Sequence, residues 1–464
     1  MITHIEIDGF KSFNQFKMDF TPLTVVAGVN AAGKSNLFDA LRLLSGLAGT
    51  DKVQKAFLEQ RGDMLELFTH FDNGAIAEKM SFAVEMLVEP TVIDAWGAEE
   101  TLKYTRLRYE LTLNRFVNSI GIMDIEVLSE KLDTIKHESD KWIRILPKDT
   151  AKTWRPPVIT GKRQTPYLYT DADSVVVPQD GKAGRKRIFP LKHATRTVLS
   201  SFDSVDFPHI LAAKNEMIGW RFLRLNPEDL RQPTSKTQGE DLISETGKNL
   251  AAALFRIKQT DSYCLKEISR KLHSFIPTFV SVDVRDDVEN KQYLIVLKDS
   301  DGKEYSSRVL SEGTLRILAL CILWQDDKYK GLLCFEEPEN GVHPSRIKTM
   351  AMLLRDLTSD FTDVDLPLRQ VIINTHSTVF IREMSETIED VNQSVYFARM
   401  VNRVMTFNGN KTNLFASIVH LVPKEKDVRI PFPDQETRLS AQMLEEFLET
   451  GNNRPGVFGE SVIL

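Results

Sequence analysis

The sequence predicts an α/β fold that combines a parallel sheet, antiparallel β-structure and helices. A short apolar run at 23–27 leads through a glycine-containing turn into a helical period over 34–47. Hydrophobic and polar residues alternate within 77–130, as they do in half-buried strands. Two further apolar runs, at 332–335 and 371–373, are typical of strands buried on both faces. A strand-turn-helix unit with separate buried strands indicates an α/β domain with a parallel sheet.

The chain divides into two parts around an insertion. Residues 1–146 are expected to form the N-terminal part, which begins with strands at 5–8 and 16–20. Residues 147–196 contain six prolines and a basic run at 182–187, so we predict a loop-rich insertion. A solvated loop is the preferred interpretation of the basic run, and contact with nucleic acid or an acidic partner is the alternative.

The second part is expected to cover 197–424, with a C-terminal tail over 425–464. Hydrophobic residues recur at helical spacing from about residue 247, and another helix is predicted over 311–324. These helices predict a helical lobe. Short strands are expected between them, at 280–284 and 293–297. No heptad pattern is sustained, which argues against a long coiled-coil arm.

Composition excludes several classes of protein. The 464 residues carry a formal net charge of −6, which argues against a globally basic DNA-coating protein but leaves a local basic patch open. Three cysteines are too few for a disulfide framework or a cysteine-rich metal site, and they indicate a reducing compartment. The apolar stretch 315–324 is far shorter than the roughly 20 residues that cross a bilayer. With no export signal in residues 1–10, we expect a cytoplasmic protein without a membrane partner.

Residues 28–35 match the phosphate-binding pattern G-x-x-x-x-G-K-[ST] in full, between a predicted strand and a predicted helix. Glycines let the backbone wrap around phosphate oxygens, and backbone N–H groups supply positive potential. Lys34 would add charge at the β- and γ-phosphates, and Ser35 would hold Mg²⁺. We therefore expect ATP and Mg²⁺ as cofactors, since a chance glycine-rich turn would not carry all four fixed positions. The residues expected to bind nucleotide here are Gly28, Asn30, Ala31, Ala32, Gly33, Lys34, Ser35 and Asn36.

Two adjacent carboxylates, Glu336 and Glu337, follow the apolar run at 332–335. Side chains at the carboxyl ends of parallel strands point into the ligand crevice. We predict that Glu336 holds Mg²⁺, through water, and that Glu337 is the general base that activates the attacking water.

Two weaker motifs complete the set. Ser311 and Gly313 stand at a predicted helix start, where a hydroxyl, backbone N–H groups and close backbone approach suit a phosphate. His376 directly follows the run at 371–373 and could contact a γ-phosphate or the attacking water. An ordinary helix cap and a structural histidine are the alternatives when each motif is taken by itself.

In this order, the four motifs resemble ABC-type ATPase heads. More narrowly, they resemble the group with RecF, the SMC and Rad50 heads, and the OLD-like AAA21 and AAA15 ATPases of bacterial defence systems. Residues 9–13 resemble the first-strand motif of this group, in which Lys11 would approach the phosphates. Residues 337–344 resemble its EEPE-x-x-x-HP stretch, with a dimer-facing D-loop at 339–343. The resemblance covers roughly residues 1–130 and 200–400.

The resemblance implies ATP-dependent pairing of two heads. Ser311 and Gly313 of one subunit would close over the nucleotide that Lys34 holds in the other. The sequence departs from the usual pattern at two positions, because Glu312 stands where transporters carry glycine and Glu336 replaces aspartate. Both residues keep the required chemistry. The glutamine of the Q-loop is not evident, and Gln60 is a weak candidate.

The tail after residue 425 is expected to be too short for the TOPRIM nuclease of OLD-like proteins. The chain therefore resembles the ATPase subunits of the two-gene anti-phage systems PARIS and Septu, which pair with a TOPRIM or an HNH nuclease. We expect an ATPase without nuclease activity that forms homo-oligomers, responds to a phage-encoded trigger or DNA, and scaffolds, restrains or activates a separate effector. The alternatives are a RecF-like repair ATPase that clamps or loads on DNA, and an ATP-bound scaffold with little turnover.

Overall fold

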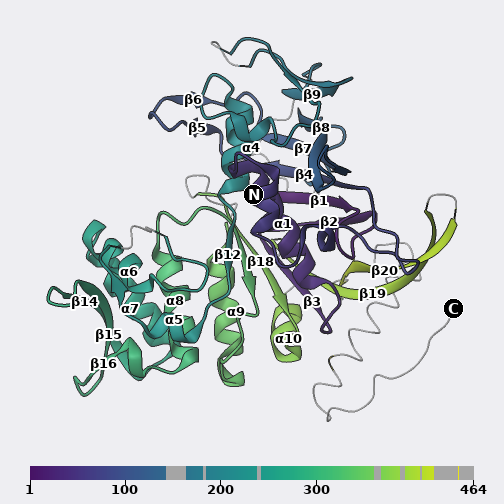
Figure 1. Cartoon of the computed structure of the whole chain (residues 1–464). Helices are drawn as coiled ribbons and strands as arrows, with labels where there is room; N and C mark the ends of the chain where they lie inside the picture. Colours follow the sequence, from purple (N-terminus) through teal and green to yellow (C-terminus); the bar gives the residue numbers. More distant parts are fainter. Residues whose placement is uncertain are drawn as a thin grey trace.

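The computed structural model describes residues 1–142, 163–180, 184–237, 242–359, 367–386, 392–407 and 410–422, together with Leu448. The expected tail over 425–464, apart from Leu448, lies outside the described residues, as do 147–162 of the expected insertion and Lys182. Within the described residues, the α/β fold with an antiparallel β subdomain and a helical lobe is confirmed (Figure 1).

A six-stranded sheet forms the centre of the fold, in the order β12-β17-β18-β3-β19-β20. Neighbouring strands are parallel except β20, which is antiparallel to β19. Both faces of the sheet are covered, since Val26 of β3 enters one hydrophobic core and Val25 enters the other. Double burial explains why β3, β17 and β18 are continuous apolar runs. The strands are β3 (Leu23–Gly28), β12 (Arg221–Leu223), β17 (Gly331–Glu336), β18 (Arg369–Thr375), β19 (Gln393–Phe407) and β20 (Asn410–Leu421).

An eight-stranded antiparallel sheet, in the order β11-β10-β9-β8-β7-β4-β1-β2, forms the second layer. The first three strands in this order, β11, β10 and β9, come from the segment predicted to be loop-rich, so the described part of that segment extends the sheet. In the basic run, Arg187 belongs to β11, and its guanidinium lies 5.4 Å from the ring centroid of Phe202 and 5.0 Å from that of Phe207. The strands are β1 (Ile2–Asp8), β2 (Phe16–Asp19), β4 (Lys79–Leu87), β7 (Arg106–Val117), β8 (Met123–Thr134), β9 (Leu168–Asp171), β10 (Ser174–Val177) and β11 (Arg187–Pro190).

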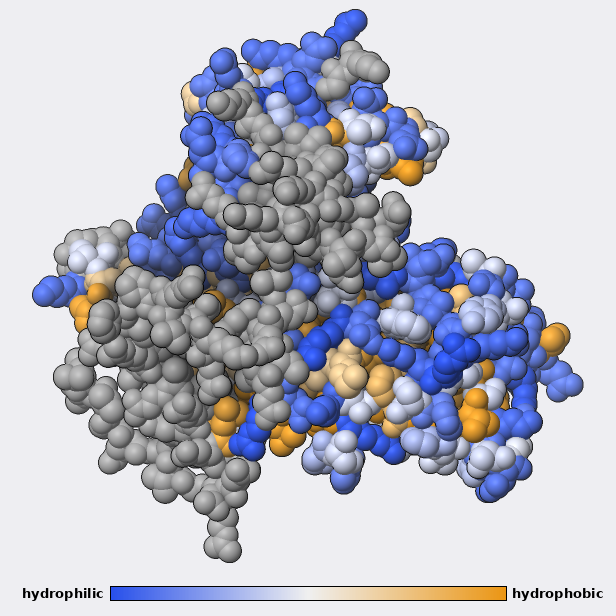
Figure 2. All heavy atoms as spheres, turned by 180° about the vertical axis from the view of Figure 1, so that it is seen from behind, coloured by the Kyte–Doolittle hydropathy of each residue, from blue (hydrophilic) through white to orange (hydrophobic). Residues whose placement is uncertain are grey.

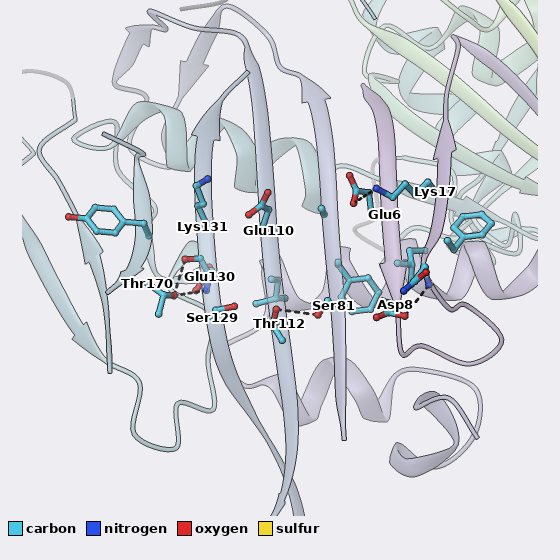
Figure 3. Close-up of a pocket in the computed structure, with 17 residues that line it drawn as sticks. Glu6, Asp8, Lys17, Ser81, Glu110, Thr112, Ser129, Glu130, Lys131 and Thr170 are labelled. Atoms are coloured by element: carbon cyan, nitrogen blue, oxygen red, sulfur yellow. Dashed lines mark hydrogen bonds and ion pairs between the residues drawn. The ribbon is translucent and has the colours of Figure 1, made fainter. Parts of the chain in front are cut away.

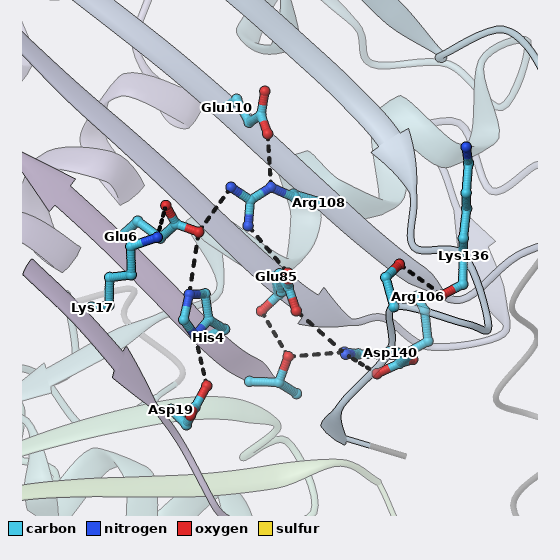
Figure 4. Close-up of polar contacts among 12 residues, drawn as sticks. His4, Glu6, Lys17, Asp19, Glu85, Arg106, Arg108, Glu110, Lys136 and Asp140 are labelled. Atoms are coloured by element: carbon cyan, nitrogen blue, oxygen red, sulfur yellow. Dashed lines mark hydrogen bonds and ion pairs between the residues drawn. The ribbon is translucent and has the colours of Figure 1, made fainter. Parts of the chain in front are cut away.

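Charged side chains connect the strands of this second sheet (Figure 4). Arg108 donates to Glu6 on β1 at 3.0 Å and to Glu85 on β4 at 3.1 Å. Arg106 is fully buried and forms two hydrogen bonds with Asp140, at 2.8 and 3.0 Å. A buried guanidinium needs such a partner, so Asp140 holds the segment after β8 against the sheet.

Helices between the two sheets fill the first core. Helix α1 follows β3 and packs against α4, with leucines at its buried positions. The helices of this layer are α1 (Lys34–Gly49), α2 (Val53–Leu58) and α4 (Pro208–Ile218), with short 3₁₀ turns η1 (Met64–Leu67) and η3 (Leu199–Ser201). A small hairpin of β5 (Thr91–Ile93) and β6 (Glu99–Thr101) lies beside α4.

The helical lobe covers the other face of the central sheet and forms the second core (Figure 1). Helix α8 is buried almost all round, which explains why its sequence is the longest apolar stretch. Its helices are α5 (Pro227–Arg231), α6 (Leu250–Thr260), α7 (Tyr263–Phe275), α8 (Glu312–Gln325), α9 (Ile347–Asp356) and α10 (Thr378–Glu386), with 3₁₀ turns η4 (Ser307–Val309) and η5 (Pro344–Arg346). Its small sheet contains β13 (Thr234–Ser235), β14 (Phe279–Asp287), β15 (Gln292–Asp299) and β16 (Glu304–Ser306).

The described surface is mostly hydrophilic on the face shown in Figure 2, and its hydrophobic residues gather only in small separate groups. Among the described helices, none is both long and apolar enough to span a membrane.

Candidate functional site

The phosphate loop connects β3 to α1 and has the backbone that its glycines predict. Gly28 has φ 149° and Gly33 has φ 85°, values that L side chains rarely adopt. A Cβ at Gly28 would also lie 2.4 Å from the carbonyl oxygen of Ala398 on β19. Ala31 has φ 64° without being glycine, so left-handed backbone also occurs between the two glycines. Because α1 begins at Lys34, its N-terminal N–H groups face the same loop.

Lys34 is held inside this loop. Its Nζ donates to the carbonyl oxygens of Gly28 and Val29, both at 2.8 Å. Burial lowers the pKa of Lys34, while the carboxylates of Glu337 and Glu339 act in the opposite direction. The phosphate loop and the stretch after β17 therefore belong to one electrostatic site.

The parallel pairing of β17, β18 and β3 brings the predicted motifs together. Glu336 is in register with Asn374 on β18, and Asn374 is in register with Val26 on β3. Glu337 comes next, with φ 46°, and its N–H donates to the carbonyl oxygen of Asn374 at 3.1 Å. This turn lets the two adjacent carboxylates face different partners.

Glu337 and His376 meet at the ends of their strands. The Nδ1 atom of His376 lies 2.8 Å from Oε1 of Glu337, and the side chain of Asn340 donates to Oε2 at 2.7 Å. Both side chains are partly exposed, at 37% for Glu337 and 43% for His376. A carboxylate positioned by a histidine and open to solvent can accept a proton from water.

Glu336 faces a cluster of charges instead. Nη2 of Arg61 lies 2.7 Å from Oε1 of Glu336, and Nε of Arg224 lies 3.8 Å from Oε2. Arg61 also approaches Asp39 of α1 at 3.8 Å, and Asp39 pairs with Nζ of Lys11 at 2.7 Å. Lys11 therefore contacts the helix that follows the phosphate loop, and its predicted approach to phosphate stays a prediction.

Arg61 is a site residue that the sequence reasoning missed. Its neighbour Gln60, the weak Q-loop candidate, donates its amide to the carbonyl of Ala56 one turn earlier and is 9% exposed. A solvated arginine on a loop has no distinctive sequence signal. Only the fold shows that Arg61 reaches Glu336.

Glu339 is the second residue that was missed as part of the site. It was expected in a dimer-facing loop, but it is only 7% exposed, and it accepts a hydrogen bond from Oγ1 of Thr375 on β18. Burial raises the pKa of Glu339. Its Oε2 atom is buried without a hydrogen-bond partner among the described residues. Glu339 therefore contacts β18 of its own chain, and the predicted dimer-facing role of 339–343 stays a prediction.

Ser311 and Gly313 lie on the helical lobe, at the start of α8. The Ser311 hydroxyl accepts from the N–H of Thr314 at 3.3 Å and caps the helix. Gly313 packs against the loop after β17, because a Cβ there would lie 2.9 Å from the carbonyl oxygen of Gly341. Their predicted contact with the nucleotide of a second copy stays a prediction.

A polar groove of about 760 Å³ lies on the antiparallel sheet (Figure 3). Acidic and basic side chains both line it, including Glu6, Glu110, Lys17 and Lys131. The phosphate loop, Glu336, Glu337 and His376 do not line this groove. It is therefore separate from the candidate nucleotide site.

Ser35 in the first turn of α1 and Glu336 at the end of β17 form a donor set that fits Mg²⁺. Ser35 and Glu336 offer the hydroxyl and carboxylate oxygens that this hard cation prefers. The described residues contain no cluster of three or more histidine, cysteine or acidic side chains that could hold a metal alone. A cation shared with phosphate oxygens suits such a sparse set.

This chain is similar to known proteins over most of its length. Residues 23–382 match the family AAA_21, described as "AAA domain, putative AbiEii toxin, Type IV TA system". A protein named "ATP/GTP phosphatase" from Helicobacter pylori (strain ATCC 700392 / 26695) is 21% identical over 396 residues, which cover 84% of this chain and 89% of that protein.

Solved structures of low identity were also found. A head domain, "SmcHead bound to the C-winged helix domain of ScpA", is 16% identical with a TM-score of 0.48, covering 92% of this chain and 99% of that one. "Recombination mediator protein RecF-ATPrS in RecFOR pathway" is 13% identical with a TM-score of 0.36, covering 91% and 98%.

Proposed function

Because this chain belongs to the AAA_21 family and is an ATPase, we propose that it hydrolyses ATP between two of its own subunits and uses the cycle to control a separate effector. The observation that carries this proposal is the meeting of Lys34, Glu337 and His376 at the ends of three adjacent strands.

Nucleotide binding is assigned to Gly28, residues 30–36 and Lys11. The N–H groups of the loop and of the first turn of α1 would hold phosphate oxygens. Lys34 would exchange its two carbonyl contacts for the β- and γ-phosphates. Ser35 and Glu336 would hold Mg²⁺, which when bound neutralises charge that develops on the phosphates.

Hydrolysis is assigned to Glu337 and His376. Glu337 would take a proton from the attacking water, and the hydrogen bond from His376 would fix the direction of its carboxylate. Asn340 donates to the second oxygen, so both carboxylate oxygens are oriented before the nucleotide arrives.

Self-association is assigned to Ser311 and Gly313. Ser311 caps the first turn of α8, and Gly313 packs on Gly341, so both residues stand at the N-terminus of this helix. A second copy that faces the first would supply this helix N-terminus, with its positive end, to the γ-phosphate.

The effector is proposed to be a separate nuclease of TOPRIM or HNH type in anti-phage defence, with a phage-encoded trigger or DNA upstream. The family description, which refers to a toxin of a type IV toxin–antitoxin system, supports a role of this kind. The RecF-like alternative, a DNA clamp, would require duplex binding, and the net charge of −6 does not favour it.

Light scattering with ATP and Mg²⁺ tests the paired head. The wild-type protein should double in mass when ATP is added, whereas Lys34→Ala should not bind ATP and Ser311→Arg should bind ATP without pairing. ATP binding by Lys34→Ala at wild-type affinity would remove the nucleotide assignment. Duplex binding that weakens steeply with salt, without a co-purifying nuclease, would favour the clamp instead.

A further inference from the structure

The hairpin of β19 and β20 lies directly against the phosphate loop. The Ser417 N–H donates to the carbonyl oxygen of Ser12 at 2.8 Å, and the two serine hydroxyls are 2.6 Å apart. A Cβ at Gly33 would lie 1.8 Å from Oγ of Ser417. This contact leaves no room for any other residue at Gly33, so β20 forms one wall of the loop.

The order of strands in the central sheet indicates which part of a bound nucleotide would lie next to β20. Strand β3, which leads into the loop, lies between β18 on one side and β19 on the other. Glu337 and His376 follow β17 and β18, so the γ-phosphate must point to that side for water to be activated. The nucleoside, at the other end of the phosphate chain, therefore lies toward β19 and β20.

The hairpin presents an exposed apolar surface at this place. Met400 is in register with Ser417, and Asn402 is in register with Phe415, so these four side chains share one face. The Ser417 hydroxyl donates to Sδ of Met400 at 3.1 Å. Phe415 is 62% exposed, although it lies only about 7 Å along the strand from Ser417. The exposed Phe415 ring is therefore available to a ligand beside the phosphate loop.

We propose that Phe415, Met400 and Asn402 form the base-binding subsite of the nucleotide that the phosphate loop holds. This inference rests on the proposed function, because it requires a nucleotide on Lys34. The Phe415 ring and the Met400 thioether offer a flat, polarisable surface for stacking with a purine. The Asn402 amide offers one donor and one acceptor, which match the edge of adenine. The subsite would give this chain a preference for ATP over GTP.

Titration calorimetry with ATP, GTP and inorganic tripolyphosphate, each with Mg²⁺, tests the subsite. Phe415→Ala should weaken ATP binding roughly tenfold and leave tripolyphosphate binding unchanged, since only ATP has a base to stack. Asn402→Ala should reduce the ratio of ATP to GTP affinity. In Phe415→Trp, ATP should change the indole fluorescence and tripolyphosphate should not.

Two control variants separate the possible failures. Val404→Ala alters the next register pair of the same face, at a residue 70% exposed, and should bind ATP as the wild type does. Lys34→Ala should lose ATP and tripolyphosphate alike, and if it loses neither, the proposed function itself is wrong. If Lys34→Ala loses both ligands as expected, three outcomes would contradict the base-binding subsite without contradicting the proposed function. They are unchanged ATP affinity in Phe415→Ala, an equal loss of both ligands, and a loss confined to self-association.

Discussion

The carboxylate of Glu337 accepts a hydrogen bond from Nδ1 of His376 at 2.8 Å, across the ends of two adjacent parallel strands. The contact joins a residue that follows β17 to one that follows β18, although 39 positions separate them in sequence. Because Asn340 holds the other oxygen of Glu337, the carboxylate is fixed from both sides.

Glu337→Gln should trap the ATP-bound assembly. Glutamine keeps the size and the hydrogen bonds of glutamate but does not accept a proton at neutral pH. Hydrolysis should fall about 10²–10⁴-fold, while ATP still binds through Lys34 and Ser35. Light scattering should show a paired state that outlasts that of the wild type, and Ser311→Arg in the same chain should prevent it. Hydrolysis at the wild-type rate would show that Glu337 is not the base.

Arg61→Ala should lower the Mg²⁺ concentration needed for half-maximal ATP binding. Arg61 occupies the Glu336 carboxylate at 2.7 Å, so its removal frees a predicted metal ligand. Arg224→Ala is the matched control, because its Nε lies 3.8 Å from the other oxygen of Glu336 and should compete less. A Mg²⁺ requirement that stays the same in both variants would mean that Arg61 and the cation do not share Glu336.

Asp140→Ala should destabilise the fold by about 3–5 kcal/mol, because the fully buried Arg106 would lose its two charged hydrogen bonds. Urea unfolding followed by circular dichroism measures the loss. Asp140→Asn, which keeps one acceptor, should lose less. A change below about 1 kcal/mol in the alanine variant would show that other contacts of Arg106 suffice.

Glu339→Gln should become more stable than the wild type as the pH rises. Burial raises the pKa of Glu339 in the folded state, so at a pH well below the ordinary pKa of glutamate the folded and unfolded states both hold the proton, and the stability of the variant relative to the wild type does not change with pH. As the pH rises, Glu339 of the wild type ionises first in the unfolded state, which lowers the free energy of unfolding. This loss of stability stops growing once the pH exceeds the pKa of Glu339 in the folded state. Melting temperatures from pH 5 to 8 check this, and a constant difference would contradict it.

Reversing Arg185 and Lys186 to glutamate should leave the ATPase rate near that of the wild type and weaken the binding of a partner or DNA. Both residues are exposed and precede β11, and neither belongs to a nucleotide motif. Arg187 is left in place because it packs on Phe202 and Phe207. A collapse of hydrolysis would assign this part of the chain to the catalytic core.

Much of the central sheet could be predicted because it is buried on both faces. Strands β3, β17 and β18 read as short apolar runs, and polar motifs stand where each one ends. Strands β19 and β20 were not predicted, since they leave the core part-way along. Residues 393–398 of β19 are buried, whereas Asn402 and Val404 are exposed, so neither a continuous nor an alternating pattern emerges.

The site was predicted where a motif fixes local backbone, and missed where tertiary contacts decide. Residues 28–35 specify their own loop through glycines at positive φ. In contrast, Arg61 belongs to the site only because α2 and the turn after it place this residue beside β17. Glu339 belongs to the site only because Thr375 lies next to it. Neither contact leaves a periodic trace in the sequence.

The packing of Gly313 on Gly341 has a kinetic consequence for a pair of subunits. Gly341 has φ 71°, and a Cβ there would lie 2.3 Å from Cδ of Glu312, so the start of α8 and the loop after β17 are in close contact. In the proposed pair, the start of α8 would bind the γ-phosphate of the neighbouring subunit. The loop after β17, which it contacts, follows the chain's own Glu337. Turnover at one site should therefore depend on occupancy of the other, and the rate should rise with ATP concentration along a sigmoidal curve.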